Sequence, residues 1–446
     1  MANHTDAAKN NPRIILRNER GISLLLALFL GITLSSIGYA TFHSVIITGR
    51  TTGHHTNATQ AFWIAEAGLE RALHYLRFAS PPPGGTAPFT YQNNIAVGNG
   101  SYTTTIDPDD ANTGTYIKGY SITVSAMVGD ISRSVSSHVR TSTFGKYAYL
   151  TGSEGGTIWF TSSDLVEGPL HSNDRISITG TPTFMGKVTS SATSFNQGSG
   201  YNPDFQAGYQ LGVPQVTFPV LQDVIDNYLL ENGGSSPALT IDARFTRDSE
   251  ITFNADGTMT YSVWYYNSWG SKIYIINNQV VDLASISGMI NVKGDVRVKG
   301  TINGQVTLLA SDNIYITDDI LYHDSDVNGI PSSSSTDLLG MISVKNVIVA
   351  DNTANRTDCT INGAILTLGD SFTVENYASG SHRGVLSIYG SLSQKVRGPV
   401  GTFGGWYGAT GYNKNYHYDQ RLNSMVPPYF PTTGQYEVTN WTELSN

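Results

Sequence analysis

The chain has 446 residues, of which only 14% are charged, and its formal net charge is −9. Soluble domains usually contain about 25% charged residues, so this composition argues against a Lys/Glu-rich helical bundle. The 26 Lys and Arg residues are spread thinly, which argues against a nucleic-acid partner. The single cysteine, Cys359, excludes an internal disulfide framework and a cysteine-based metal site. The 46 Gly and 25 Tyr residues favour short strands separated by turns, so a mainly β chain is expected.

The first 50 residues have the pattern of a membrane helix behind a basic flank. Residues 1–21 carry a net positive charge, and no charged residue occurs from 22 to 49. A stretch of about 20 apolar residues is enough to cross a bilayer, and a basic flank keeps the preceding segment in the cytoplasm. We therefore expect a basic leader over 1–21 and a single transmembrane helix over 22–49. A signal anchor, a cleaved Sec signal and a leader cut after Gly21 share this pattern, and the residues around Gly21 (ERGISL) favour the last.

A second, amphipathic helix is expected over 50–80. Its apolar residues recur at helical spacing and form one packing face: Phe62, Ala65, Leu69, Ala72, Leu73 and Leu76. Pro81–Pro83 and the following glycines end it. If the two helices are continuous, with some loosening at Gly49–Gly53, they extend over about 87 Å.

This N-terminal region resembles that of PilX-type minor pilins. The resemblance covers residues 13–78 and rests on a basic segment ending in Gly, an apolar helix and then Ala61–Leu73 (AFWIAEAGLERAL). It implies that a prepilin peptidase cuts after Gly21 and methylates Ile22. It also implies that the helix leaves the bacterial inner membrane to join other pilin subunits, with the help of the pilus assembly machinery. Major pilins carry Glu at the fifth mature position, where this chain has Leu26, so the resemblance implies a minor subunit.

Residues 86–143 alternate between apolar and polar side chains, as a small β meander does. Gly129-Asp130 provides one of its turns. A helix laid against such a sheet is the pilin architecture in outline. The acidic loop Asp107–Asn112 is either a calcium-binding loop or a solvated turn.

Residues 145–403 contain short strands with Gly and Asn at their corners, a pattern that indicates a β-solenoid. Four similar segments begin at Gly288, Gly340, Gly363 and Gly384. A single coil cannot bury its apolar face alone, so coils are expected to stack. A sandwich or barrel is the alternative. Segments 168–188 and 389–399 resemble an uncharacterised solenoid-like domain that follows PilX-type N-termini, and this resemblance implies no activity.

Two further segments are expected to depart from the solenoid. Residues 209–280 form an insertion, with a helix at Val220–Glu231 and a hairpin turn at Asp256-Gly257. Residues 404–446, which are rich in Tyr, are expected to wrap the last coil as a cap, because an open strand edge invites pairing.

Asp324, Asp326 and Asn328, followed by Gly329, match the start of a calcium loop, in which oxygens at alternate positions converge on the ion. Asp337 offers a later oxygen in place of the usual Glu. The pattern predicts a Ca²⁺ site made by Asp324, Asp326, Asn328 and Asp337, and a polar solenoid loop is the alternative.

An aromatic cluster within the insertion consists of Trp264, Tyr265, Tyr266 and Trp269. On an exported protein these side chains predict a contact with a surface glycan or an adhesin partner. Packing of the insertion onto the solenoid is the alternative.

The sequence contains no G-x-S-x-G, H-E-x-x-H, Walker A or dinucleotide-binding motif. The adjacent carboxylates of Asp318 and Asp319 would point to opposite faces of a strand, so no catalytic residues are predicted. The predicted function is a non-enzymatic minor pilin or pseudopilin-like subunit of a type IV pilus or related filament. It would be stored in the inner membrane with its N-terminus in the cytoplasm, and would display an exported solenoid for assembly priming or adhesion. The alternative is a membrane-anchored extracellular enzyme that acts on polysaccharides.

Overall fold

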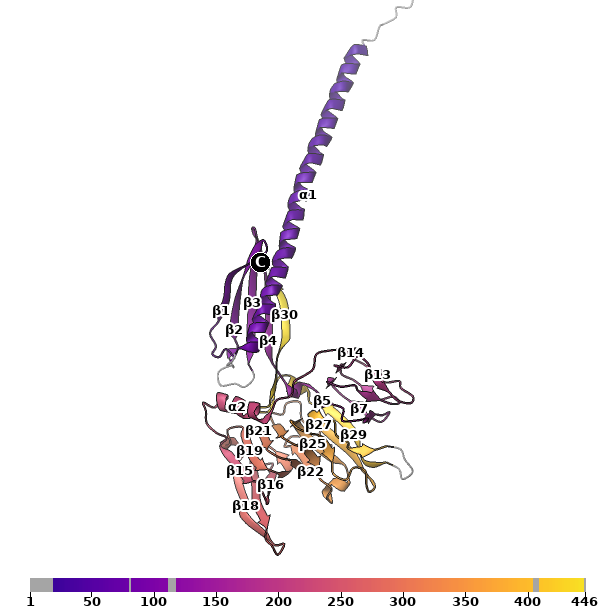
Figure 1. Ribbon diagram of the computed structural model, residues 1–446. Helices are drawn as coiled ribbons and strands as arrows, with labels where there is room; N and C mark the ends of the chain where they lie inside the picture. The colour runs from indigo at the N-terminus through magenta and orange to yellow at the C-terminus, as the bar shows by residue number, and fades with distance from the viewer. Residues whose placement is uncertain (1–18, 80–81, 111–117, 404–408, 445–446) are drawn as a thin grey trace, which may run out of the picture.

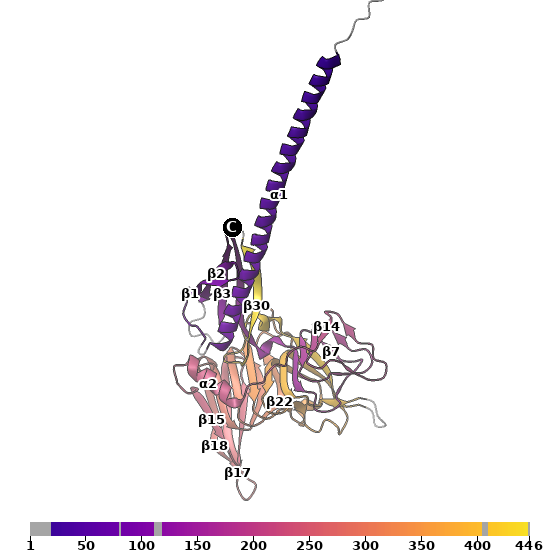
Figure 2. The same cartoon turned by 45° about the horizontal axis from the view of Figure 1, so that its top comes forward.

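The computed structural model describes residues 19–79, 82–110, 118–403 and 409–444. The chain consists of a long helix, a small sheet that covers one end of it, and a larger β body beyond the sheet (Figures 1 and 2). The prediction of a mainly β chain with one long N-terminal helix is confirmed. Residues 1–18 of the predicted leader and residues 111–112 of the predicted acidic loop lie outside the described residues.

Helix α1 runs without a break over Glu19–Phe78. The predicted membrane helix and amphipathic helix are therefore one rod of about 90 Å. No loosening occurs at Gly49–Gly53, because a glycine inside a helix costs only about 1 kcal/mol and each further residue of a formed helix adds a backbone hydrogen bond.

The C-terminal part of α1 packs on a five-stranded antiparallel sheet in the order β1-β2-β3-β4-β30. Four of its strands lie within the predicted meander: β1 (Phe89–Val97), β2 (Gly100–Pro108), β3 (Gly119–Val128) and β4 (Ile131–Thr143). The fifth, β30 (Thr432–Leu444), comes from the other end of the chain and pairs along β4, with Val438 opposite Val139. All residues between β4 and β30 are therefore inserted between two neighbouring strands of one sheet.

The structure differs from the cap that the sequence predicted over 404–446. In that segment, β29 (Thr410–Tyr418) belongs to the larger β body, whereas β30 belongs to the sheet that carries α1. β30 pairs with the backbone groups along the edge of β4, which would otherwise be unpaired. The sequence does not predict this pairing, because β4 becomes an edge strand only when the sheet has formed.

The larger body, which we call the coil stack, is built from strands that pair mainly in parallel from one turn to the next. Its strands are β5 (Tyr149–Ser153), β6 (Trp159–Phe160), β7 (Leu165–Val166), β8 (Leu170–Ser172), β9 (Ser177–Ile178), β10 (Thr183–Phe184), β11 (Val188–Ser190), β12 (Asn196–Gln197), β13 (Asp204–Phe205), β14 (Tyr209–Leu211), β15 (Leu239–Ala243), β16 (Arg247–Phe253), β19 (Met289–Gly294), β20 (Val296–Ile302), β21 (Gln305–Ala310), β22 (Ile314–Tyr322), β23 (Leu338–Ser343), β24 (Val347–Val349), β25 (Cys359–Thr367), β26 (Phe372–Val374), β27 (His382–Val396), β28 (Gly401–Thr402) and β29. This parallel pairing differs from the pairing in a sandwich of antiparallel sheets.

The coils are not stacked in chain order. One face reads β15-β19-β21-β23-β25-β27-β5-β8-β11-β14, so the first coils of the chain follow the last one in space. At this junction Leu392 of β27 lies opposite Tyr149 of β5, and Asn415 of β29 lies opposite Leu165 of β7. The two ends of the coil stack are therefore formed by β14 and β15, which are close in sequence.

Only part of the insertion predicted at 209–280 leaves the coil stack. β15 and β16 pair in parallel with β19 and β20 and form the terminal coil. Helix α2 (Leu221–Glu231) forms where the sequence predicted it, and Asp256-Gly257 lies in the turn after β16. Strands β17 (Thr258–Tyr266) and β18 (Lys272–Asp282) then extend that end as an antiparallel pair, the distal hairpin.

The segment between β14 and β15 crosses from one end of the coil stack to the other. Its Phe218 is buried and lies 5.2 Å from the ring of Phe144, and Tyr228 of α2 lies 4.6 Å from the ring of Tyr429. Residues before β30 cover β23: a Cβ built at Gly340 would lie 2.9 Å from Cδ2 of Phe430 and 3.1 Å from Cβ of Pro427, and every residue of β23 is buried rather than every second one.

Candidate functional site

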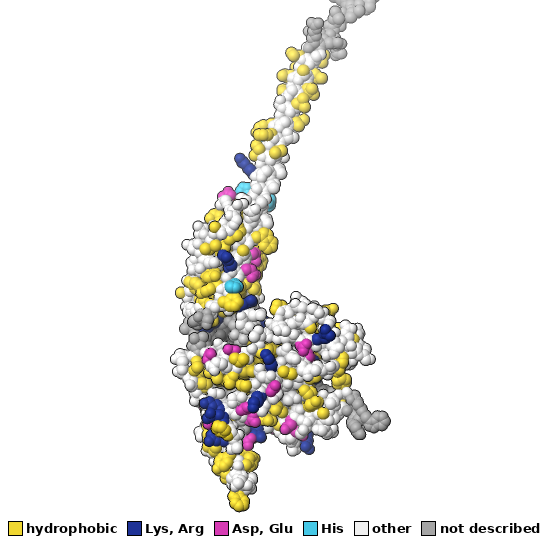
Figure 3. Space-filling model, in the orientation of Figure 1, with side chains coloured by type: hydrophobic (Ala, Val, Ile, Leu, Met, Phe, Trp, Pro, Cys, Tyr) yellow, Lys and Arg dark blue, Asp and Glu magenta, His cyan; other side chains and the backbone are white. Residues whose placement is uncertain are grey.

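The N-terminal half of α1 stands free of the rest of the chain. Every side chain from residue 21 to 56 is exposed, and most of the large ones up to Ile47 are apolar. Figure 3 shows these hydrophobic side chains along the shaft. Among the described residues, α1 is the one helix long and apolar enough to cross a membrane, judged by length and composition. An exposed apolar surface of this size marks a site of contact with a membrane or with other proteins.

The residues with predicted roles in processing lie at the beginning of this bare segment. Gly21 has no atom within 4 Å of the position that a Cβ would take, and Ile22 is exposed. Leu26, which stands where major pilins carry Glu, is also exposed. The backbone after Gly21 is helical.

The C-terminal part of α1 buries one face against the sheet. Of the six residues predicted for this face, Ala65, Leu69, Ala72 and Leu76 are buried, and Phe62 and Leu73 are partly buried. Sequence reasoning missed Ala61, Ile64 and Gly68, which are buried on the same face. The spacing of Ala61, Ala65, Gly68 and Ala72 was a usable signal, because small residues let a helix approach a sheet closely.

Gly68 is the point of closest approach between α1 and the sheet. A Cβ built at this position would lie 2.7 Å from Cδ2 of Tyr102 and 2.7 Å from Cγ1 of Val124. Both side chains are fully buried in the core between the helix and the sheet. The glycine in the AEAGLE motif therefore leaves room for a tyrosine ring of β2.

Two polar side chains of the same motif attach α1 to the sheet. Glu66 Oε1 accepts a hydrogen bond of 3.0 Å from Nε1 of Trp441 on β30. Arg71 Nη1 donates to the hydroxyl of Tyr102 at 3.2 Å, and that hydroxyl donates to Gln92 Oε1 at 2.7 Å. No local sequence signal links Glu66 with Trp441, because the two lie at opposite ends of the chain.

Two of the four predicted calcium ligands, Asp326 and Asp337, accept hydrogen bonds from backbone amides of the protein. Asp326 Oδ1 accepts the backbone amides of Asn328 and Ile330, each at 2.9 Å. Asp337 accepts the amides of Gly304 at 2.7 Å and His323 at 3.2 Å. In the described part of the chain, no group of three or more His, Cys, Asp or Glu side chains is placed so that it could hold a metal ion. Asp324, Asp326 and Asp337 therefore do not form such a group.

The aromatic cluster is divided between the core and the tip of the distal hairpin. Trp264 is 4% exposed, and Nζ of Lys272 lies 3.5 Å from its ring centroid. Tyr265 is partly buried, whereas Tyr266 and Trp269 are exposed. Trp264 is therefore packed within the structure, whereas Tyr266 and Trp269 are accessible, and their contact with a glycan or an adhesin stays a prediction.

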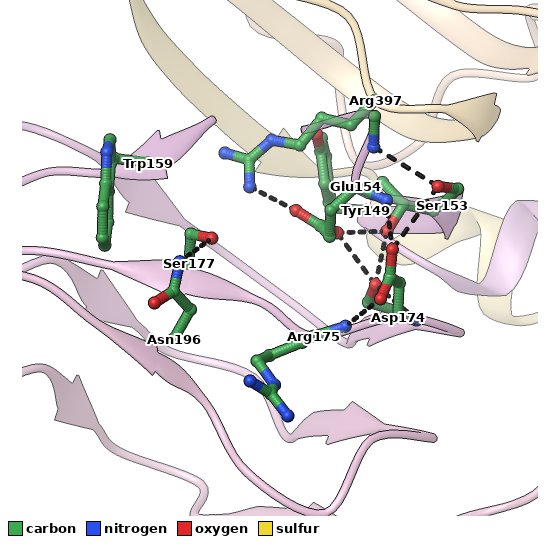
Figure 4. A network of polar contacts seen from close by, with 12 residues as sticks. Tyr149, Ser153, Glu154, Trp159, Asp174, Arg175, Ser177, Asn196 and Arg397 are labelled. Atoms are coloured by element: carbon green, nitrogen blue, oxygen red, sulfur yellow. Dashed lines mark hydrogen bonds and ion pairs between the residues drawn. The ribbon is translucent and has the colours of Figure 1, made fainter. Parts of the chain in front are cut away.

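Buried ion pairs connect the last coil of the chain to the first. Arg397, just after β27, donates from Nη1 to Oε2 of Glu154 at 2.7 Å, and these side chains are only 1% and 4% exposed. Figure 4 shows the guanidinium of Arg397 directed toward the carboxylate of Glu154. The other carboxylate oxygen of Glu154 accepts hydrogen bonds from the hydroxyls of Thr151 at 2.6 Å and Ser172 at 2.8 Å. The guanidinium also lies 4.0 Å from the ring centroid of Phe160. The buried carboxylate is thus neutralised and both of its oxygens accept hydrogen bonds, whereas Nη2 of Arg397 is buried without a hydrogen-bond partner among the described residues.

A second, partly buried pair stabilises the other strand of this junction. Lys414 of β29 contacts Asp164, which precedes β7, with Nζ 2.8 Å from Oδ2. Burial lowers the pKa of Lys414, although Asp164 opposes that shift. Sequence reasoning missed all four charged residues, because neither partner of a pair has a local signal that points to the other.

The polar groups considered for catalysis have structural contacts. Asp319 Oδ1 accepts the amide of Thr360 at 2.8 Å, and burial raises the pKa of this carboxyl. Asp318 Oδ1 accepts the amide of Asp319 at 2.9 Å. Burial also raises the pKa of the Cys359 thiol, which keeps it in the unreactive neutral form.

Comparison with known proteins gives limited matches. A family model described as "Domain of unknown function (DUF4900)" matches residues 115–193, a range that extends from the sheet into the first coils. Among solved structures, the competence-associated pilin ComZ from Thermus thermophilus is similar, with 13% sequence identity and a TM-score of 0.31 over 87% of this chain and 98% of that chain. No curated protein matches the chain. The function therefore has to be inferred from the geometry of the chain itself.

Replacing Gly68 by Leu should detach α1 from the sheet. The new side chain overlaps Tyr102 and Val124, and overpacking of this kind costs about 1–3 kcal/mol. Thermal unfolding and limited proteolysis of the full chain measure the loss. Gly53→Leu is the matched control, since nothing lies within 4 Å of a Cβ at Gly53. Equal stability of the two variants would contradict the close approach.

Arg397→Met should destabilise the coil stack by about 3–5 kcal/mol, because it leaves the charge of Glu154 buried without a partner. Adding Glu154→Gln should recover part of this loss, since it removes the lone charge. Arg133→Met is the control. It breaks an exposed ion pair with Glu443, which contributes at most about 1 kcal/mol. Denaturant unfolding of the full chain distinguishes these values, and a loss no larger than the control's would show that the junction pair is dispensable.

Proposed function

We propose that the chain is a non-enzymatic, pilin-like subunit of a type IV pilus or a related filament. The observation that carries this proposal is the division of α1 into a bare apolar half and a half docked on an antiparallel sheet. A helix satisfies its own backbone hydrogen bonds, so it is stable both in a bilayer and in a bundle of apolar helices. The bare half can therefore be stored in a membrane and later transferred into a filament, while the docked half keeps the exported part attached.

The sequence before α1 and the size of the coil stack support the finer details of this role. The basic residues before α1 favour an inner-membrane subunit whose N-terminus is cytoplasmic and whose sheet and coil stack are exported. A prepilin peptidase, the assembly machinery and other pilin subunits are the partners that this storage and transfer require. The bulk of the coil stack and the apolar Leu26 favour a minor subunit that primes assembly or displays the coil stack for adhesion.

Processing of the N-terminus tests the proposal. In the cell that makes the protein, mass spectrometry should find a mature chain that begins at methylated Ile22. Gly21→Val should remain uncut, because a peptidase that cleaves after a glycine has no room for the branched side chain. Gly31→Val, in the same bare segment and with open space around it, is the control and should be processed normally. An intact Met1, or a cut beyond Tyr39, would overturn the pilin-like role.

A further inference from the structure

The distal hairpin places an apolar tip at the end of the molecule opposite the bare half of α1 (Figures 1 and 3). Trp269, in the turn between β17 and β18, is 89% exposed. Other large side chains on either side of that turn are also exposed: Tyr266, Ile273, Tyr274 and Ile275. An exposed group of this size on a folded surface indicates a contact rather than a packing accident.

A second apolar side chain lies at the same end. Phe245 belongs to the turn between β15 and β16, and this turn lies beside the hairpin tip because Arg247 pairs with Tyr265. Phe245 is 92% exposed and has a φ of +67°. A bulky residue rarely adopts this conformation. Holding an aromatic ring outward in a strained turn is typical of a functional position.

Basic side chains flank this apolar tip. Lys272 begins β18, where its Nζ lies over the rings of Trp264 and Tyr274, and Lys293 is exposed on β19. Within the described ranges, neither lysine has an acidic partner within ion-pair distance. Arg244 and Arg247 lie beside them and share Asp242. The tip thus combines apolar and cationic groups, although the whole chain is acidic.

Two classes of partner fit this surface poorly. A protein that adds a strand needs a regular edge, but β18 has register shifts opposite the segment Tyr261–Trp264, and its Asn278 has a φ of +51°. Such bulges interrupt the backbone groups that a new strand would pair with. A glycan would stack on Trp269 and Tyr266, but it would leave Phe245 and the exposed isoleucines beside polar hydroxyl groups.

We propose that the tip, defined by Phe245, Tyr266, Trp269, Ile273, Tyr274 and Ile275, binds the surface of a lipid bilayer that contains anionic headgroups. Tryptophan and tyrosine favour the boundary between headgroups and acyl chains, and isoleucine and phenylalanine gain from entering it. The lysines and arginines complement the anionic headgroups. Among the described residues, β18 pairs in register with β17 alone. The backbone groups on its other edge limit the depth of insertion to the interface, because unpaired backbone groups are not tolerated in hydrocarbon. This inference gives the displayed coil stack a partner, the lipid surface. It rests on the proposed function in one respect: α1 must occupy a different membrane or filament from the bilayer that the tip binds.

A vesicle-capture assay tests the inference with the full chain. The bare half of α1 is held in a nanodisc of neutral phosphatidylcholine, and separate vesicles contain about 30% phosphatidylglycerol. The protein-bearing nanodiscs should float with these vesicles, and empty nanodiscs should not. The double variant Phe245→Ser/Trp269→Ser should reduce the bound fraction about tenfold, because it removes two apolar anchors. Raising the salt concentration should weaken capture of the wild-type chain.

Val327→Ser is the matched control, because Val327 is a fully exposed apolar residue on a loop away from the tip. It should be captured like the wild type, and all variants should unfold at the same temperature. Capture that is absent, or equal in the wild type and the double variant, would overturn the inference. Binding to insoluble polysaccharide without capture by vesicles would also overturn it, in favour of a glycan. Failure of the pilin-like role is detected by a different measurement, in which mass spectrometry finds an N-terminus that has not been cut after Gly21.

Discussion

The arrangement of the inserted residues depends on one contact, the parallel pairing of β27 with β5 and of β29 with β7. This contact joins two segments that are far apart in sequence and turns two short stacks of coils into one. Each short stack would otherwise expose an open end with unpaired backbone groups and apolar side chains. The ion pairs Arg397–Glu154 and Lys414–Asp164 favour one register of this junction, because a slip by one residue would separate the partners and leave the carboxylates of Glu154 and Asp164 buried without them.

The same junction explains how the coil stack is attached to α1. Because the chain enters the stack at β5 and leaves it after β29, both connections to the small sheet begin near the middle of the stack rather than at its ends. They continue as the neighbouring strands β4 and β30. The coil stack therefore has two covalent links to the sheet that holds α1, and Glu66 and Trp441 add a direct contact between α1 and the returning strand.

This attachment separates the two surfaces to which we assign a function. The bare half of α1 projects from one end of the molecule, and the distal hairpin projects from the other (Figure 1). Both expose apolar side chains, but the helix can hide its backbone in hydrocarbon and the hairpin cannot. The first surface is thus suited to a membrane core or a helix bundle, and the second to an interface.

The sequence by itself determined the elements that depend on local patterns. The charge-free stretch and the repeat of Ala65, Leu69, Ala72 and Leu76 predicted the bare and docked parts of α1. The alternation around Gly129 predicted two strands of the sheet, and the short Gly-bounded strands predicted parallel coils. Only the tertiary structure decided where distant segments meet: the return of β30 to β4, the order of the coils, the partner of Glu66, the burial of Trp264, and the use of Asp326 and Asp337 as acceptors for backbone amides. Local patterns record which face of an element is buried, whereas the choice of partner depends on edges and charges that come together only when the chain is folded.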